Sequence, residues 1–183
     1  MTGPQPRPAA SPGNSSPHGG PGHLVRVRRG SGADAPSIRV LSRHAFAPWG
    51  EGGDMVPAWL SHPGVTAFVA EIDGRFAGFM MIGLVPVLGG GWRMDAEVLA
   101  IAVEPSYRRS GVASRLVEDA LAWVRGRAAE LPITRVALST AVDNLAAQAL
   151  FQRWGFRFAG RRRGYYTSGH DAWRMVLKVV RRG

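Results

Sequence analysis

Cysteine is absent from the sequence of 183 residues. Disulfide bridges, thiolate catalysis and cysteine-ligated metal sites are therefore excluded. The histidines do not have the spacing of metal ligands, so we predict no metal site. No uninterrupted apolar run approaches the roughly 18 residues that a membrane-spanning helix needs, and no membrane association is expected. The first 22 residues carry Arg7 as their only charge and have no apolar core, so we expect no signal peptide and predict a cytoplasmic protein.

Lysine is almost absent: Lys178 is the only one, and arginine supplies the rest of a net charge of +10. A charge of this size is typical of proteins that bind nucleic acids. The arginines are dispersed along the chain, however, apart from short runs such as residues 161–163. We therefore do not expect specific nucleic-acid binding. Attraction to a polyanionic cofactor or to an acidic surface fits the composition better.

The chain divides into a tail and a single domain. Pro, Gly and Ser occupy 14 of the first 22 positions, a composition that cannot bury enough apolar surface to offset the entropy of ordering. We predict a disordered tail over residues 1–22 and one domain over residues 23–183. Nothing in the sequence repeats.

Hydrophobic periodicity gives the order of elements within the domain. Asp34 occupies an N-cap position and Pro36 the first turn of a helix. Asp73 and Gly74 lie between two apolar runs and predict a tight hairpin. The predicted strands cover residues 23–28, 65–72, 75–85, 98–103, 134–140, 156–161 and 172–180, and the predicted helices follow Asp34, cover residues 54–60, and begin at 112 and 144. A right-handed crossover makes strand 134–140 parallel to strand 98–103.

One stretch of this order has the features of an anion site. The apolar run 98–103 is followed by a basic loop containing Arg108, Arg109 and Gly111, and then by a helix with apolar residues at 112, 116, 117, 120, 121 and 124. The first N–H groups of a helix have no internal partner and attract phosphate. The alternative is an ordinary strand-to-helix connection with a solvated basic loop.

Two motifs resemble the signatures of the GNAT N-acetyltransferase superfamily. The first is Arg108-x-x-Gly111-x-Ala113 after a strand that ends Ile101-Ala102-Val103-x-Pro105, and the second is Asn144-x-x-Ala147-x-x-Leu150-Phe151-x-x-x-Gly155-Phe156. Within the superfamily the chain looks most similar to the ribosomal-protein-alanine type of N-terminal acetyltransferase. The resemblance covers residues 24–180. It implies an α/β (α+β) fold with a mixed, mostly antiparallel central sheet, about four flanking helices, and a splayed pair of parallel strands that holds the cofactor.

The resemblance also implies acetyl-CoA as co-substrate and assigns residues to it. The pyrophosphate would lie on backbone N–H groups of the basic loop and the helix start, and the pantetheine arm would pair with the edge of the preceding strand. Asn144 would bind the pantetheine near its reactive end, although an Asn here is also an ordinary N-cap and can fill both roles. The implied cofactor-binding residues are Ile101, Ala102, Val103, Arg108, Arg109, Ser110, Gly111, Val112, Ala113, Ser114, Asn144 and Phe151.

Glu97 is the predicted catalytic base. It precedes the apolar run, and period-two alternation places it in line with Leu99 and Ile101. Its separation from the pyrophosphate motif matches the strand glutamate that serves as base in the histone-type branch of the superfamily. The alternative is a solvated glutamate at the end of a strand.

Two positions depart from the family pattern. Phe151 stands where the second motif usually carries a tyrosine that acts as general acid, and Ser139 stands where the ribosomal type carries a glutamate, five residues before Asn144. Tyr165 or Tyr166 could supply a phenol instead, but a substrate-lining role fits them better, and Trp49 is expected to line the acceptor cleft with them. Trp59 is a second aromatic residue expected to flank that cleft.

The predicted reaction is direct attack of a primary amine on the thioester of acetyl-CoA. The acceptor is a protein N-terminus or a small molecule, and the enzyme is a monomer or a homodimer. The alternatives are a small-molecule amine acetyltransferase and a catalytically weak regulatory module that binds acyl-CoA. The acceptor loops lie outside both motifs, so the motifs do not select among these.

Overall fold

The computed structural model describes residues 24–50, 55–87, 89 and 92–180. The predicted disordered tail over 1–22 lies outside these residues, so the tail and the domain boundary at residue 23 stay predictions. Among the described residues, no helix combines the length and the apolar character needed to cross a membrane.

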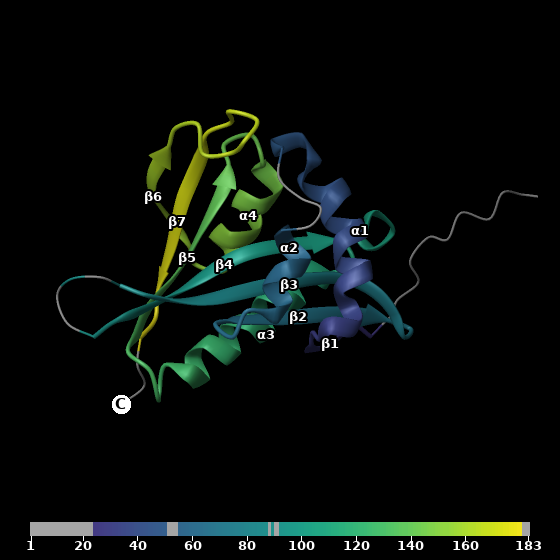
Figure 1. The fold of residues 1–183 in the computed structure, drawn as a ribbon, viewed down its shortest axis with the longest axis horizontal. Coiled ribbons are helices and arrows are strands. Elements are labelled where there is room, and N and C mark those ends of the chain that lie inside the picture. Colours follow the sequence, from purple (N-terminus) through teal and green to yellow (C-terminus); the bar gives the residue numbers. More distant parts are fainter. Residues whose placement is uncertain (1–23, 51–54, 88, 90–91, 181–183) are drawn as a thin grey trace, which may run out of the picture.

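Seven strands form one sheet in the order β1-β2-β3-β4-β5-β7-β6 (Figure 1). All neighbours are antiparallel except β4 and β5, which are parallel. The strands are β1 (Arg26–Arg29), β2 (Val65–Ile72), β3 (Arg75–Pro86), β4 (Met94–Val103), β5 (Ile133–Ala141), β6 (Arg157–Arg162) and β7 (Ala172–Lys178). The α-helices of the described residues are α1 (Ala35–Phe46), α2 (Met55–Ala58), α3 (Val112–Arg127) and α4 (Leu145–Arg153). The predicted fold class and the parallel pair are confirmed.

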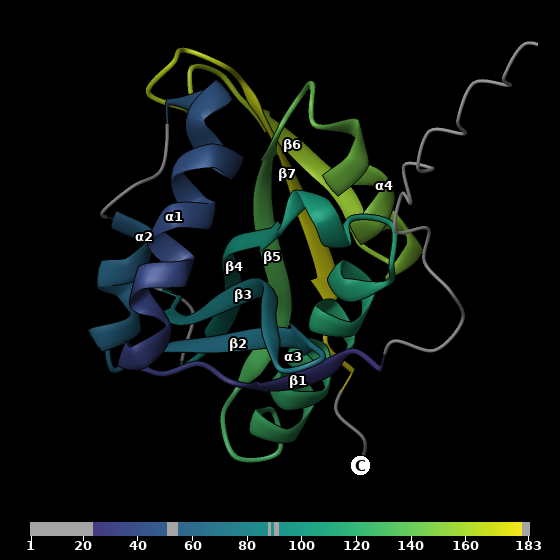
Figure 2. The ribbon, with the colours of Figure 1, turned by 90° about the vertical axis from the view of Figure 1, so that its right-hand side faces the viewer.

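Helices cover both faces of the sheet. Figure 2 shows α1 and α2 on one face and α3 and α4 on the other. The side of α1 and α2 buries Ile38, Leu41 and Phe79 in one apolar cluster. The side of α3 and α4 buries a larger cluster, in which the six apolar positions predicted for α3 are all buried. The burial of these six apolar side chains, rather than helix propensity, stabilises α3 on the sheet.

The hairpin between β2 and β3 has the predicted turn. Asp73 and Gly74 both have positive φ, 50° and 72°. Two such residues form the type of turn whose twist matches the twist of paired strands.

A β-bulge in β4 corrects one prediction. Met81 of β3 pairs with Ala100 and Ile82 pairs with Val98, so that Leu99 is an extra residue in β4. Val98 packs in the cluster under α3, whereas Ala100 packs in the cluster under α1. The bulge therefore reverses the alternation, and Ile101 does not lie in line with Glu97 as predicted.

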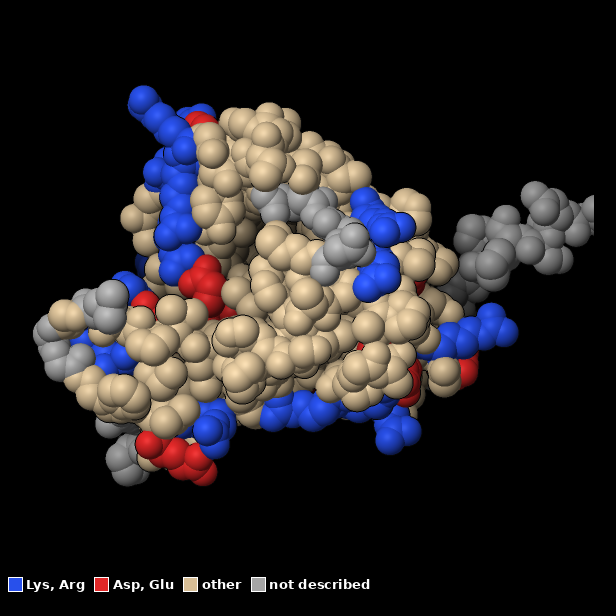
Figure 3. Space-filling view, viewed as in Figure 1, with Lys and Arg blue, Asp and Glu red and all other residues tan. Residues whose placement is uncertain are grey.

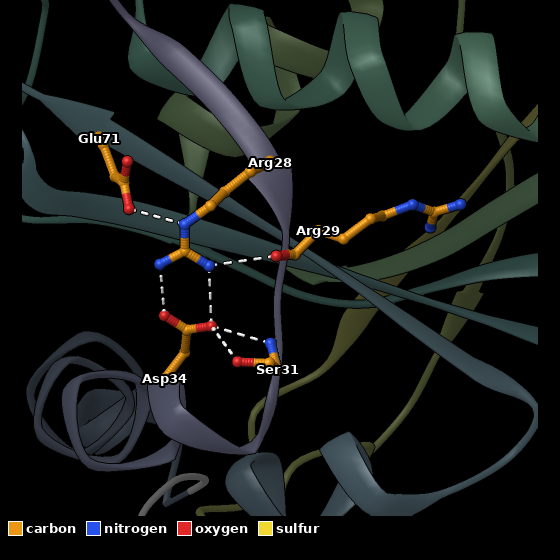
Figure 4. Close-up of polar contacts among 5 residues, drawn as sticks. All are labelled: Arg28, Arg29, Ser31, Asp34 and Glu71. Carbon is orange, nitrogen blue, oxygen red and sulfur yellow. Dashed lines mark hydrogen bonds and ion pairs between the residues drawn. The ribbon is translucent and has the colours of Figure 1, made fainter.

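Arg28 ties three elements of the α1 side together (Figure 4). Its guanidinium donates to Asp34 at 2.7 and 3.0 Å and to Glu71 of β2 at 2.6 Å. Asp34, at the predicted N-cap position of α1, accepts from the Ser31 N–H at 2.8 Å instead of capping the helix with its side chain. The hydrogen bond from Arg28 lowers the pKa of the Asp34 carboxyl below its usual value. This buried carboxylate fixes the start of α1 against β1.

Candidate active site

The parallel strands β4 and β5 separate after a short paired stretch. Their pairing runs from Met94 with Ile133 to Val98 with Leu138. Beyond it β4 continues to Val103 along β3, while β5 continues to Ala141 along β7. The strands therefore splay at their carboxyl ends, as predicted. The unpaired edge of β4 beyond Val98 faces the start of α4 across this opening.

The loop between β4 and α3 has the backbone of an anion site. Gly111, the N-cap of α3, has φ 86°, and Arg109 also has positive φ, 63°. No described side chain caps α3. The N–H groups of the first helical turn thus point out of the helix without intrahelical partners, at the positive end of the helix dipole.

A cavity of about 730 Å³ extends from this loop along the β4 edge. Ser110, also predicted at the pyrophosphate, does not line it; its hydroxyl donates to the Tyr107 carbonyl at 2.5 Å. The structure brings the other predicted pyrophosphate residues and the predicted strand edge together in its wall: Ile101, Ala102, Val103, Arg108, Arg109, Gly111, Val112, Ala113 and Ser114. The volume of this cavity and its open strand edge fit the pantetheine of coenzyme A, and the uncapped start of α3 with the two arginines fits the pyrophosphate.

Asn144 and Phe151, both predicted at the cofactor, belong to the same helix, α4, but lie in different environments. Asn144 caps α4, and its Oδ1 accepts from the Ala147 N–H at 3.1 Å. Phe151 is buried and packs edge-on against Phe156, with ring centroids 5.2 Å apart. The N-cap role of Asn144 is therefore confirmed, while its contact with pantetheine stays a prediction.

A second cavity of about 430 Å³ adjoins the first and shares Asn144, Ile101 and Trp49 with it. Its wall is rich in apolar and aromatic side chains from the end of α1, from α2 and from the β6–β7 loop. All predicted acceptor residues lie in it: Trp49, Trp59, Tyr165 and Tyr166. The sequence did not single out Phe46, Met55 and Val56, which also line it.

The β6–β7 loop is attached to the chain segment after α1. Trp49 donates from Nε1 to Asp143 at 3.2 Å, and its ring lies 6.1 Å from that of Tyr166. Thr167 donates from its hydroxyl to the Gly50 carbonyl at 2.7 Å. Segments more than one hundred residues apart in sequence thus form one wall of the cavity, which Figures 1 and 2 show as the β6–β7 loop leaning on the end of α1.

Glu97 lies in the second cavity and forms a two-point ion pair with Arg174 of β7. Arg174 donates from Nη1 to Oε1 and from Nη2 to Oε2, the latter at 2.7 Å. The Glu97 side chain is 21% exposed and the Arg174 side chain is 19% exposed. Glu97 is therefore not the solvated glutamate of the alternative interpretation. Charge-assisted bonds on both oxygens fix the position of this carboxylate.

Sequence reasoning missed Arg174. A charged residue between apolar neighbours inside a strand is rarely buried unless it is paired, and this pattern was the available signal. Arg174 of β7 lies opposite Ser139 of β5 in the strand register. Ser139 occupies the position where the family usually has a glutamate. The Ser139 hydroxyl is buried at the cavity wall and has no hydrogen-bond partner in the described part of the chain.

Comparison with known proteins decides the family. The acetyltransferase (GNAT) family matches residues 36–156 of the chain. This range includes β4, α3 and α4, which contribute residues to the walls of the cavities. The chain belongs to this family. As an acetyltransferase it transfers an acetyl group from acetyl-CoA to an amine.

Relatives of this acetyltransferase include proteins that are named N-alpha-acetyltransferases. The chain is 34% identical over 111 residues to N-alpha-acetyltransferase 30 of Schizosaccharomyces pombe, which covers 61% of this chain and 70% of that protein. It is 36% identical over 101 residues to N-alpha-acetyltransferase RimI of Mycobacterium tuberculosis, covering 55% of this chain and 56% of that protein. Its fold is similar to the crystal structure of the ribosomal-protein-S18-alanine N-acetyltransferase from Escherichia coli, with TM-score 0.71, 26% identity, and coverage of 87% and 97% of the two chains.

Proposed function

We propose that this acetyltransferase modifies the α-amino group of a polypeptide. The observation that carries the proposal is the continuity of the two cavities at Asn144 and Ile101, with Glu97 on the side away from the phosphate loop. An amine in the smaller cavity would meet a thioester that arrives along the β4 edge. The names of the two sequence relatives support a polypeptide N-terminus as the acceptor.

The chemistry of the amine also favours an N-terminus. An α-amine has a pKa near 8, whereas a lysine side chain has one near 10.4. At neutral pH a far larger fraction of the α-amine is therefore already the neutral nucleophile. A site with a single carboxylate is sufficient for such an acceptor.

The cofactor residues have distinct proposed roles. The N–H groups from Arg109 to Ser114 would bind the pyrophosphate, and Arg108 would add charge. The edge Ile101–Ala102–Val103 would pair with pantetheine like a missing strand, because β5 has left that edge. Asn144 would bind pantetheine near the thioester, and Phe151 forms the apolar wall beside it.

Glu97 is the proposed base. The amine nitrogen attacks the acetyl carbonyl carbon, the carbon–sulfur bond breaks, and the proton that the amine loses passes to Glu97. The departing thiolate takes its proton from water, since Phe151 has none to give. Arg174 is a positioning residue that holds the carboxylate toward the cavity, and Trp49, Tyr165 and Tyr166 line the acceptor. The cytoplasmic location and the monomeric or homodimeric state remain predictions.

The test is acetyl-CoA-dependent release of free thiol against a panel of acceptors. The panel holds peptides with free N-termini, N-blocked peptides with an internal lysine, and small amines. Turnover of free N-termini alone is the expected result. Turnover of small amines alone would replace the proposal with a small-molecule acetyltransferase. Binding of acetyl-CoA without turnover of any acceptor would favour the regulatory acyl-CoA module.

A further inference from the structure

Three exposed arginines lie together on β6 and just after it. Arg157, Arg162 and Arg163 form what we call the β6 arginine patch. In the described part of the chain, no carboxylate lies within ion-pair distance of any of them. Their neighbour Arg161 differs, because it donates to Asp171 at 2.8 Å and lies over the Trp173 ring.

Two members of the patch, Arg157 and Arg162, project to the same side of the sheet as the acceptor cavity. Arg157 pairs with Val176 of β7, and Arg162 pairs with Ala172. Val176 and Ala172 are each two residues from Arg174, whose side chain reaches Glu97, so all of these side chains project to one face. Figure 3 shows a column of basic side chains over β6 and β7, beside a hollow in the surface, with acidic atoms near its upper and lower ends.

The patch begins at the rim of that cavity. The Arg162 guanidinium lies 5.3 Å from the ring of Tyr165, which lines the cavity. Register places Glu97, Ala137, Val176 and Arg157 in one row across β4, β5, β7 and β6. Three strand spacings give about 14 Å from Glu97 to this arginine, which an extended peptide covers in about four residues.

We propose that the acceptor polypeptide carries acidic residues shortly after its acetylated terminus, and that the β6 arginine patch binds them. The inference rests on the proposed function, because it needs a polypeptide whose N-terminus occupies the smaller cavity. Counting about four residues from the cavity, the carboxylates belong near positions three to six of the acceptor. Exposed cations at the rim of a binding site select a partner by charge and accelerate its association.

A peptide fits the patch better than a nucleic acid does. Acidic groups interrupt the basic surface: Arg161 of β6 is paired with Asp171, and Figure 3 shows acidic atoms at the lower end of the column. A continuous phosphate backbone laid along the column would pass these groups and be repelled by them. Separate carboxylates on a flexible peptide can contact the arginines and avoid these acidic groups.

The experiment compares three peptides that share their first two residues and carry acidic, neutral or basic residues at positions three to six. We expect kcat/KM for the acidic peptide to exceed that for the neutral peptide by about tenfold, through KM, and the basic peptide to be the poorest substrate. The preference should contract toward unity at about 1 M salt, where the screening length is about 3 Å.

Charge-reversal variants test whether the β6 arginine patch causes the preference for the acidic peptide. Arg157→Glu combined with Arg162→Glu should abolish or invert the preference of the enzyme for the acidic over the basic peptide. Arg125→Glu on α3 makes the same type of charge change at an exposed site that lines neither cavity, and should keep the preference.

Equal turnover of the three peptides would overturn the inference and leave the proposed function intact. Turnover of small amines without any peptide would overturn both. The wild-type enzyme is also tested with an oligonucleotide. If the oligonucleotide binds, if the charge-reversed variant loses this binding, and if the acidic peptide does not displace it, then the ligand of the patch is a nucleic acid and not a peptide.

Discussion

The two cavities of this acetyltransferase are built in opposite ways. The proposed cofactor side is lined mainly by one continuous stretch, residues 101–114, whose backbone N–H groups and strand edge would provide the binding surface. The acceptor side collects side chains from α1, α2, β4, β5 and the β6–β7 loop. A phosphate can be bound by local backbone geometry, whereas an acceptor is bound by side chains that only the complete fold brings together.

The charges of the two sides differ as well. Arg108 and Arg109 line the cofactor cavity and form no ion pair with a carboxylate in the described chain, so they are available to an anionic ligand. The central charge of the acceptor cavity, Glu97, is already paired with Arg174. A mutation on one side should therefore change the kinetics of one substrate only, and the predictions for Glu97, Gly111 and Gly50 test this separation.

Glu97→Gln should have the largest effect. We expect kcat to fall by at least tenfold, and by about a hundredfold if the loss is typical of a missing general base. The dissociation constant of acetyl-CoA should not change, because Glu97 lies outside the cofactor cavity. Steady-state kinetics and equilibrium binding measure the two quantities, with Glu118→Gln on the exposed side of α3 as control. Unchanged turnover would remove Glu97 from the mechanism.

Asp34→Asn should destabilise the α1 side. Breaking the buried contact with Arg28 is expected to cost about 2 kcal/mol of unfolding free energy at pH 7. Because the folded-state pKa of Asp34 is lowered, its contribution is present above the ordinary value of 3.8 and is lost as the pH falls through the folded-state value. Urea unfolding should therefore show a gap between wild type and variant that narrows below pH 3.8.

The control for that prediction is the exposed ion pair between Glu130 and Arg127, whose atoms lie 2.6 Å apart. Glu130→Gln should stay within about 0.5 kcal/mol of wild type, since exposed pairs contribute little. A gap for Asp34→Asn that is independent of pH would contradict the role given to its charge.

Gly111→Val should weaken acetyl-CoA binding by about tenfold, because a β-branched residue at φ 86° costs roughly 1–2 kcal/mol. No atom lies within 4 Å of the added Cβ, so the effect belongs to the backbone and not to a clash. Gly111→Asn should recover most of the affinity, since Asn tolerates this conformation. Acceptor KM should stay constant in both variants. Equal affinities for the Val and Asn variants would exclude backbone strain as the cause.

Gly50→Ala should give the smallest effect, on the acceptor side. Gly50 has φ 72°, and an added Cβ would lie 2.4 Å from the Thr167 hydroxyl oxygen. The β6–β7 loop must shift away, and we expect the acceptor KM to rise by about threefold with acetyl-CoA binding unchanged. Gly126→Ala on α3, where no atom lies within 4 Å, is the matched control. A change in acetyl-CoA affinity would show that the two cavities are coupled.

Most residues of the predicted cofactor side lie together in one cavity wall, because the signals that pointed to them are local. The strand, the glycine, the arginines and the helix periodicity occur in one short stretch, and each has a direct structural meaning. The Asp73–Gly74 hairpin and the capping role of Asn144 were predictable for the same reason. The bulge at Leu99 was not, because an extra residue in an apolar strand leaves no signal in the alternation until the partner strand is known.

The sequence by itself determined the order of elements, the apolar face of α3 and the loop that we propose binds phosphate, since these follow from hydrophobic period and backbone preference over a few residues. Only the tertiary structure decided how the wall of the acceptor cavity is assembled and which contacts hold it. The pairing of Glu97 with Arg174, the contact of Gly50 with Thr167 and the position of the β6 arginine patch each join segments far apart in the chain. Sheet register and helix packing set these distances, and neither is encoded in any one local stretch.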